Sequence, residues 1–195
     1  SVLSEYGAKV IIGDSPGGPF SPMLLKSIYS VCEMDKAAKL GNAELNYNTE
    51  HTICQFPDGK ILKKITVGAY IKDCDKIISV CRLKTHCMTK MTGAVKNMFG
   101  TIPGTTKAEY HFYCPDVDNF ANCLIDICLN AKPILSFMDA IIGMEGEGPT
   151  AGKPRKIGAI LASENPFHMD YIASKIINAS VDDIPILKNS IKRGL

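Results

Sequence analysis

Four runs of apolar, largely β-branched residues constrain the fold of this chain most strongly. They cover residues 8–14 (AKVIIGD), 75–83 (DKIISVCRL), 133–144 (PILSFMDAIIGM) and 157–163 (IGAILAS). Short runs that are apolar in their centres and lead into polar loops are typical of strands buried in a parallel sheet. The segments between them must then supply the helices that cover such a sheet.

The segments between these strands carry helix signals. Ser21-Pro22 supplies an N-cap and a first helical position before MLLKSIYSVCEM. Helices are also expected at 89–99, at 115–131, where the apolar residues recur on one face, and at 167–180.

A β-hairpin is predicted between residues 43 and 72, because Asp58-Gly59 lies between segments of alternating polarity. Strands that alternate with helices, with one hairpin inserted, predict an α/β fold. We expect a three-layer, mostly parallel sheet flanked by helices, in a single domain over residues 1–195.

Composition excludes several classes of protein. The chain has 195 residues, 46% of them hydrophobic and 22% charged, which suits one globular domain. With a net charge of +2 and dispersed Lys and Arg, no nucleic-acid partner is expected. No apolar run approaches the ~18 residues of a membrane span, and the opening SVLSEYG lacks a secretory signal, so we expect a cytoplasmic fragment of a longer protein.

The eight cysteines indicate reduced thiols with structural roles. Several lie inside apolar segments, where a thiol behaves as a small hydrophobic group. No C-x-x-C occurs, so the ligand patterns of zinc ribbons and ferredoxins are missing from these residues.

Three polar loops follow predicted strands: Asp14–Ser21, Lys84–Lys96 and Asp139–Arg155. Ligands of parallel α/β sheets bind beyond the carboxyl ends of the strands. We therefore expect these loops to meet at one crevice. The ligand of this crevice would be a small anionic molecule.

The first loop offers backbone N–H groups and a hydroxyl close to a helix start, a setting that suits phosphate or carboxylate. Its candidate binding residues are Asp14, Ser15, Gly17 and Gly18. It matches neither the phosphate-loop consensus nor G-x-G-x-x-G. The alternative is an ordinary turn with an Asp or Ser cap.

The central loop carries the densest set of polar groups. His86 titrates near neutrality, so it can act as an acid, a base or a metal ligand, and Lys96 is a second candidate catalytic residue. On a helix over 89–99, Thr89, Thr92 and Lys96 would share one face. Other candidate binding residues are Lys84, Thr85, Gly93 and Asn97. The alternative is a solvated helix with a hydrogen-bonded histidine.

The third loop contains carboxylates among glycines. Glu145 is the candidate acid or base there, and Gly146 is a candidate binding residue. A plain surface loop is the alternative. His111, which follows the Gly-Thr-Ile-Pro-Gly segment, is a candidate metal ligand.

The central and third loops resemble the signatures of the DUF362 family (domain of unknown function 362), which is widespread in prokaryotes. K-T-H-x-x-T-x-x-T-G-x-x-K-N-x-x-G is matched by Lys84 through Gly100, and D-x-I-x-x-M-E-G-x-G-P by Asp139 through Pro149. Members often carry a 4Fe-4S ferredoxin-like module, usually C-terminal, and a preceding Lys-Pro-Asn strand. Neither is in this sequence. The resemblance therefore implies that any cluster or ferredoxin-like partner lies outside these residues.

A second likeness is to the nickel-pincer lactate racemases. That likeness would make His86 the proton-transfer histidine, Lys96 the lysine that tethers the cofactor, and His111 the nickel ligand after Pro103-Gly104. The rest of the motif differs, and a second catalytic histidine has no match. It implies a shared architecture and pocket, not lactate racemisation.

Three functional classes stay open at this point. The first is an enzyme or ligand-binding domain for a small anionic metabolite, with His86 moving protons and the lysines neutralising charge. The second is a redox or metal-dependent protein that works with a 4Fe-4S module. The third is a non-catalytic scaffold.

Overall fold

The computed structural model describes residues 2–195, which group into two compact units. The first comprises the chain up to Cys54, Thr66–Cys74 and Gly100–Glu109. The second comprises Gln55–Ile65, Asp75–Phe99 and Tyr110–Leu195. The α/β class predicted from the sequence is confirmed in both.

The second unit is built on a four-stranded sheet with the order β6-β5-β7-β8. The strands are β5 (Ile78–His86), β6 (Lys90–Thr92), β7 (Leu135–Glu145) and β8 (Lys153–Ser163). β5 and β7 run parallel, while β6 and β8 pair antiparallel with their neighbours. The sheet is therefore mixed rather than mostly parallel. The reason is that β5–β6 and β7–β8 are joined by loops too short for a parallel crossover.

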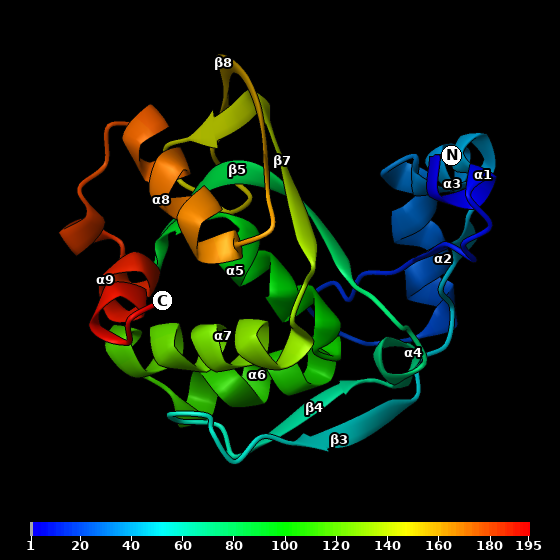
Figure 1. The fold of residues 1–195 in the computed structure, drawn as a ribbon, viewed down its shortest axis with the longest axis horizontal. Helices are drawn as coiled ribbons and strands as arrows, with labels where there is room; N and C mark the ends of the chain where they lie inside the picture. The colour runs from blue at the N-terminus through cyan, green and yellow to red at the C-terminus, as the bar shows by residue number, and fades with distance from the viewer. Residues whose placement is uncertain (1) are drawn as a thin grey trace. The chain divides into compact units, whose positions relative to one another are not determined.

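The core of this unit lies on one face of the sheet. Figure 1 shows the helices α5 (Ala94–Asn97), α8 (Pro166–Ile176) and α9 (Pro185–Lys192) of this unit. Their buried side chains form one core cluster with those of β5 and β7. Buried members include Cys81, Leu83, Met138 and Met169. On the opposite face Val80 and Ile160 are 70% and 69% exposed. This unit thus has two layers where three were expected.

Four other helical segments lie between β6 and the C-terminus. They are η1 (Met98–Thr101), α6 (Gly104–Tyr113), α7 (Val117–Ala131) and η2 (Val181–Asp183). Asp116 caps α7 by accepting a hydrogen bond from Asn119 N at 2.8 Å. Among residues 2–195, no helix has both the length and the apolar character needed to cross a membrane.

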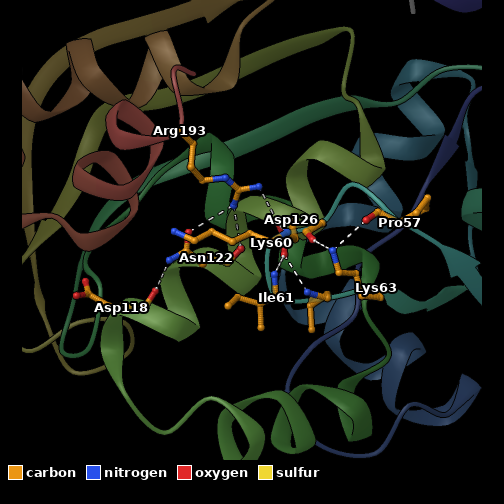
Figure 2. A network of polar contacts seen from close by, with 10 residues as sticks. Pro57, Lys60, Ile61, Lys63, Asp118, Asn122, Asp126 and Arg193 are labelled. Carbon is orange, nitrogen blue, oxygen red and sulfur yellow. Dashed lines mark hydrogen bonds and ion pairs between the residues drawn. The ribbon is translucent and has the colours of Figure 1, made fainter.

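A buried carboxylate ties α7 to the loop before β4 (Figure 2). Asp126 accepts hydrogen bonds from the backbone N–H groups of Lys60, Ile61 and Leu62 at 2.7–3.0 Å. It also pairs with Arg193 at 2.7 Å. Asp126 is completely buried, so these partners replace the water that its charge has lost.

The first unit contains α1 (Val2–Glu5), α2 (Pro22–Val31), α3 (Met34–Gly41) and α4 (Ala69–Lys72). Ser21 caps α2 as predicted, accepting a hydrogen bond from Leu24 N. The predicted strand 8–14 is reduced to β1 (Ile11–Ile12), which pairs in parallel with β2 (Glu44–Leu45) in a sheet of its own. Three apolar residues in a row predict a strand but not the sheet that it joins.

The predicted hairpin is present. It consists of β3 (His51–Gln55) and β4 (Lys64–Gly68), which form a two-stranded sheet. The boundary between the two units crosses both strands. Its turn is closed by the hydrogen bond from Gly59 N to Phe56 O at 3.0 Å.

Candidate functional site

His86 ends strand β5 and is held in one orientation by the turn that follows it. Its Nδ1 atom accepts hydrogen bonds from the backbone N–H groups of Met88 at 3.1 Å and Thr89 at 3.3 Å. Because two donors point at Nδ1, the neutral ring carries its proton on Nε2. His86 therefore offers an Nε2–H donor to a ligand.

The charged groups that act on His86 are positive. The pKa of His86 is lowered to about 4. Burial is the largest cause of this shift, followed by Lys96, Lys84 and His111. Burial and Lys96 also lower the pKa of His111. Both imidazoles are therefore neutral at pH 7. We call Lys84, His86, Lys96 and His111 the cationic cluster.

Aromatic rings support two members of the cationic cluster. The Nζ atom of Lys96 lies 5.5 Å from the centroid of Phe99, within the range of a cation–π interaction. His111 stacks on Phe120 with ring centroids 4.2 Å apart. Phe99 meets both His111 and Phe120 edge-on. Phe99 and Phe120 are buried, so the contacts of Lys96 with Phe99 and of His111 with Phe120 connect these two side chains to the core.

Thr92 brings a hydroxyl beside Lys84. The two residues are directly opposed in the β5–β6 pair, so their side chains share one face of the sheet. The Thr92 hydroxyl is buried and has no hydrogen-bond partner within residues 2–195, and the same holds for Thr85. Thr89 differs, because its hydroxyl donates to Met91 O at 3.1 Å inside the turn.

The helix expected over 89–99 begins later. Lys90–Thr92 is strand β6, and α5 starts only at Ala94. Lys90 adopts φ 64°, a left-handed conformation that turns the chain back along β5. The expectation that Thr89, Thr92 and Lys96 share one helix face is therefore wrong.

Gly93 and Asn97 tie α5 to its surroundings. A Cβ atom on Gly93 would lie 2.6 Å from Cγ of Asp170, so only glycine fits. Asn97 donates through Nδ2 to Ser79 Oγ at 3.0 Å and to Val80 O at 3.2 Å. These two motif residues thus fix the short helix that carries Lys96.

The loops that follow β5 and β7 meet, as the sequence predicts for neighbouring parallel strands. Cys87 N donates to Gly148 O at 3.0 Å. A Cβ atom on Gly148 would lie 2.7 Å from Thr85 Oγ1 and even closer to the Thr85 carbonyl. Glycine is therefore required where the third loop closes against the central loop.

Glu145 lies at the end of β7 with an exposed side chain. Its Oε2 atom is 3.5 Å from Nη1 of Arg155 on the facing strand. Gly146 follows with φ 79°, which glycine adopts without strain. The structure thus places this candidate acid or base in an ion pair of the β7–β8 hairpin.

The first loop lies in the first unit and packs on residues 100–107. Ser15 is 3% exposed, and its hydroxyl has no hydrogen-bond partner within residues 2–195. Lys107 Nζ donates to the Ser15 carbonyl oxygen. Burial lowers the pKa of Lys107, while Asp14 opposes that shift.

Glycines shape this loop. Gly18 adopts φ 104°, and a Cβ atom added to Gly17 or Gly18 would have no other atom within 4 Å. Gly104 approaches the backbone of Pro16 and Gly18 so closely that no Cβ atom fits.

Sequence reasoning missed Lys107 and Asp170. Lys107 follows Pro103-Gly104, and Asp170 lies in an amphipathic helix. A lysine or aspartate in such a setting carries no local signal, because its contacts come from distant parts of the chain. Among residues 2–195, no three His, Cys, Asp or Glu side chains gather in a way that could hold a metal ion.

Comparison with known proteins places these motifs in context. A family model described as Domain of unknown function (DUF362) matches residues 1–175. The chain is 29% identical over 201 residues to "Thylakoid-associated protein sll1697" of Synechocystis sp. (strain ATCC 27184 / PCC 6803 / Kazusa). That alignment covers 100% of this chain and 59% of the relative, so the chain spans less than two thirds of its length. No solved structure matches significantly.

Proposed function

We propose, from the premise that this chain belongs to the DUF362 family of unknown function, that its second unit binds a small anionic metabolite at the cationic cluster. One observation carries the proposal. Besides burial, the charges that lower the pKa of His86 at pH 7 are those of Lys96 and Lys84, and both are positive. Like charges that surround a half-buried ring repel one another, and a bound anion relieves that repulsion.

Three residues of the cationic cluster, together with Thr92, have distinct roles in this proposal. Lys84 and Lys96 neutralise the charge of the ligand, and Thr92 supplies the neighbouring hydroxyl. His86 donates its Nε2–H to a ligand oxygen. A neutral histidine that donates in this way polarises a carbonyl or an oxyanion without carrying charge itself.

The geometry favours His86 as a donor over His86 as a base. To accept a proton on Nε2 the neutral ring would first have to move its own proton to Nδ1, where two backbone N–H groups already point. Glu145 is the proposed second acid or base. Because its carboxylate pairs with Arg155, that role requires Glu145 to exchange its partner.

The first loop is proposed as an anion contact of the first unit. Asp14, Ser15, Gly17 and Gly18 present a buried hydroxyl and backbone groups there, beside Lys107. In both units a buried hydroxyl without a hydrogen-bond partner among residues 2–195 lies next to a lysine, which supports the proposal.

A redox or metal-dependent role is the second proposal, and it rests on the family resemblance. It would place a 4Fe-4S module outside these residues and make His111 a ligand for nickel or another metal. His111 is the residue of the cluster exposed for such a role. The relative of this chain is described as thylakoid-associated. We propose a cytoplasmic location for this protein.

The test is sulfate binding, measured by isothermal titration calorimetry at low ionic strength. Lys84→Gln and Lys96→Gln should each weaken binding by roughly tenfold or more, since each removes a charge-assisted contact. His86→Gln should weaken it less. Lys156→Gln on β8, two strands away from β5, is the matched control. Equal affinity of Lys84→Gln, Lys96→Gln and the control would contradict the proposal.

A further inference from the structure

Asp170 is a buried carboxylate that contacts the start of α5 from a distant part of the chain. It lies in α8 and is 1% exposed. Its Oδ1 atom accepts a hydrogen bond from Ala94 N at 2.6 Å, and Oδ2 accepts one from Val95 N at 3.1 Å. Both carboxylate oxygens are therefore used to hold the first turn of the helix that carries Lys96.

The chain leaves space for this carboxylate at Gly93. Gly93 has an extended backbone, so its conformation does not require glycine. A Cβ atom there would nevertheless lie 2.6 Å from Cγ of Asp170 and closer still to Oδ1. Gly93 and Asp170 are thus in close contact although they are 77 residues apart in the sequence. The Asp170 carboxylate leaves no room for a side chain at position 93.

Burying a carboxylate at this position is unfavourable by itself. Burial raises the pKa of Asp170 to about 7, and the two backbone N–H groups oppose that shift. Burial, and after it the charge of Asp170, raises the pKa of the Cys81 thiol in β5 and of the Cys128 thiol in α7. An isolated buried charge is costly, so the hydrogen bonds to α5 are the interactions that offset the burial.

We propose that Asp170 is a positioning residue for the anion site of the second unit, holding α5 so that Lys96 faces Lys84 and His86. This inference rests on the proposed function. Asp170 accepts a hydrogen bond from Val95 N, immediately before Lys96. Asn97, immediately after Lys96, donates a hydrogen bond to Ser79 on β5. The ammonium group is thus placed by contacts on both sides of its Cα atom. Asp170 acts through α5 and does not touch the ligand.

The test compares Asp170→Asn and Gly93→Ala with Asp126→Asn. Asp126 is the matched control, because it is also a buried carboxylate that accepts backbone N–H groups but holds a different loop. Sulfate affinity is measured by calorimetry, and stability by urea unfolding. Asp170→Asn and Gly93→Ala should weaken sulfate binding by roughly tenfold, the scale of one hydrogen bond to a charged group. Asp126→Asn should lower stability but leave sulfate affinity within about twofold.

A second readout separates positioning from general stabilisation. The amide protons of Ala94 and Val95, followed by NMR from pH 5.5 to 8.5, should shift as Asp170 titrates, and this step should be missing in Asp170→Asn. If Lys84→Gln loses sulfate while Asp170→Asn and Gly93→Ala retain it, the positioning role is overturned and the proposed function stands. If the wild type does not bind sulfate, the positioning role and the proposed function are both overturned. Should Asp170→Asn fail to fold, Gly93→Ala decides the outcome.

Discussion

At the scale of single residues, the backbone decides what His86 can do. The sequence places a histidine after a buried strand and suggests acid, base or metal chemistry. The turn then directs two N–H groups at Nδ1, which leaves Nε2–H as a donor. Burial and the neighbouring lysines lower the pKa of His86 and keep the ring neutral. A histidine that the sequence suggests as a proton carrier is thus, in its neutral form, an Nε2–H donor.

The pKa of His86 is a direct prediction at this scale. It should lie near 4 without ligand and rise when sulfate binds, because an anion favours the imidazolium. Sulfate should therefore bind more tightly as the pH falls below the pKa of the complex. The folded pKa lies below the ordinary 6.5, so the stability that this residue contributes is present above pH ~6.5 and is lost as the pH falls toward 4.

Imidazole C–H resonances followed by NMR during a pH titration measure this pKa. His168, exposed on α8, should not respond to sulfate and serves as the internal control. A ligand-free His86 that titrates near 6.5, or a pKa that sulfate leaves unchanged, would contradict the assignment.

At the scale of elements, two loops meet because two strands are parallel neighbours. β5 and β7 deliver their carboxyl ends to one edge of the sheet, so the loop after each strand lies beside the other. The contact is made by backbone atoms, from Cys87 N to Gly148 O. The two loops can approach this closely because Gly148 has no side chain.

Gly148→Ala tests this loop contact. The added methyl group would meet the carbonyl and the hydroxyl of Thr85, so we expect a loss of about 1–3 kcal/mol in the free energy of unfolding. Weaker sulfate binding should accompany it, because the end of β5 carries Lys84 and His86. Gly17→Ala, with open space around it, should change stability by less than about 0.5 kcal/mol. Urea unfolding of both variants makes the comparison, and equal effects would contradict the contact.

At the scale of the whole molecule, the cysteines differ in how deeply they are buried. All eight are free thiols, and Cys81, Cys114, Cys123 and Cys128 are buried in the second unit. Cys114 and Cys123 lie with their sulfur atoms 2.8 Å apart. Burial raises the pKa of Cys81 to about 12 and also raises that of Cys128. Since thiolates are the reactive form, these groups are shielded in two ways.

Thiol labelling of the intact chain checks this distribution. With an aromatic disulfide reagent at pH 8, Cys32 and Cys87 should react quickly, because they are exposed. The four buried thiols should react only as the protein unfolds. In denaturant without reductant, all eight should react. A lower total would show that a disulfide forms in the protein as isolated.

Local patterns in the sequence predicted many of the elements. Ser21-Pro22 starts α2, Asp58-Gly59 turns the hairpin, and the apolar runs become β5, β7 and β8. These features depend on neighbours in the chain, through caps, turn conformations and period-two alternation. The family motif likewise predicted Lys84, His86 and Lys96 as candidate site residues.

What the sequence by itself determined is therefore the α/β class, the strands and helices with strong local signals, and the residue types of the site. Only the tertiary structure decided the mixed sheet, the later start of α5, the tautomer of His86, and the contacts of Asp170 and Lys107. These depend on long-range packing and hydrogen bonding, and an aspartate 76 residues from its partner leaves no trace in a local pattern. Local propensity selects elements, whereas burial and the pairing of polar groups across the fold select their arrangement.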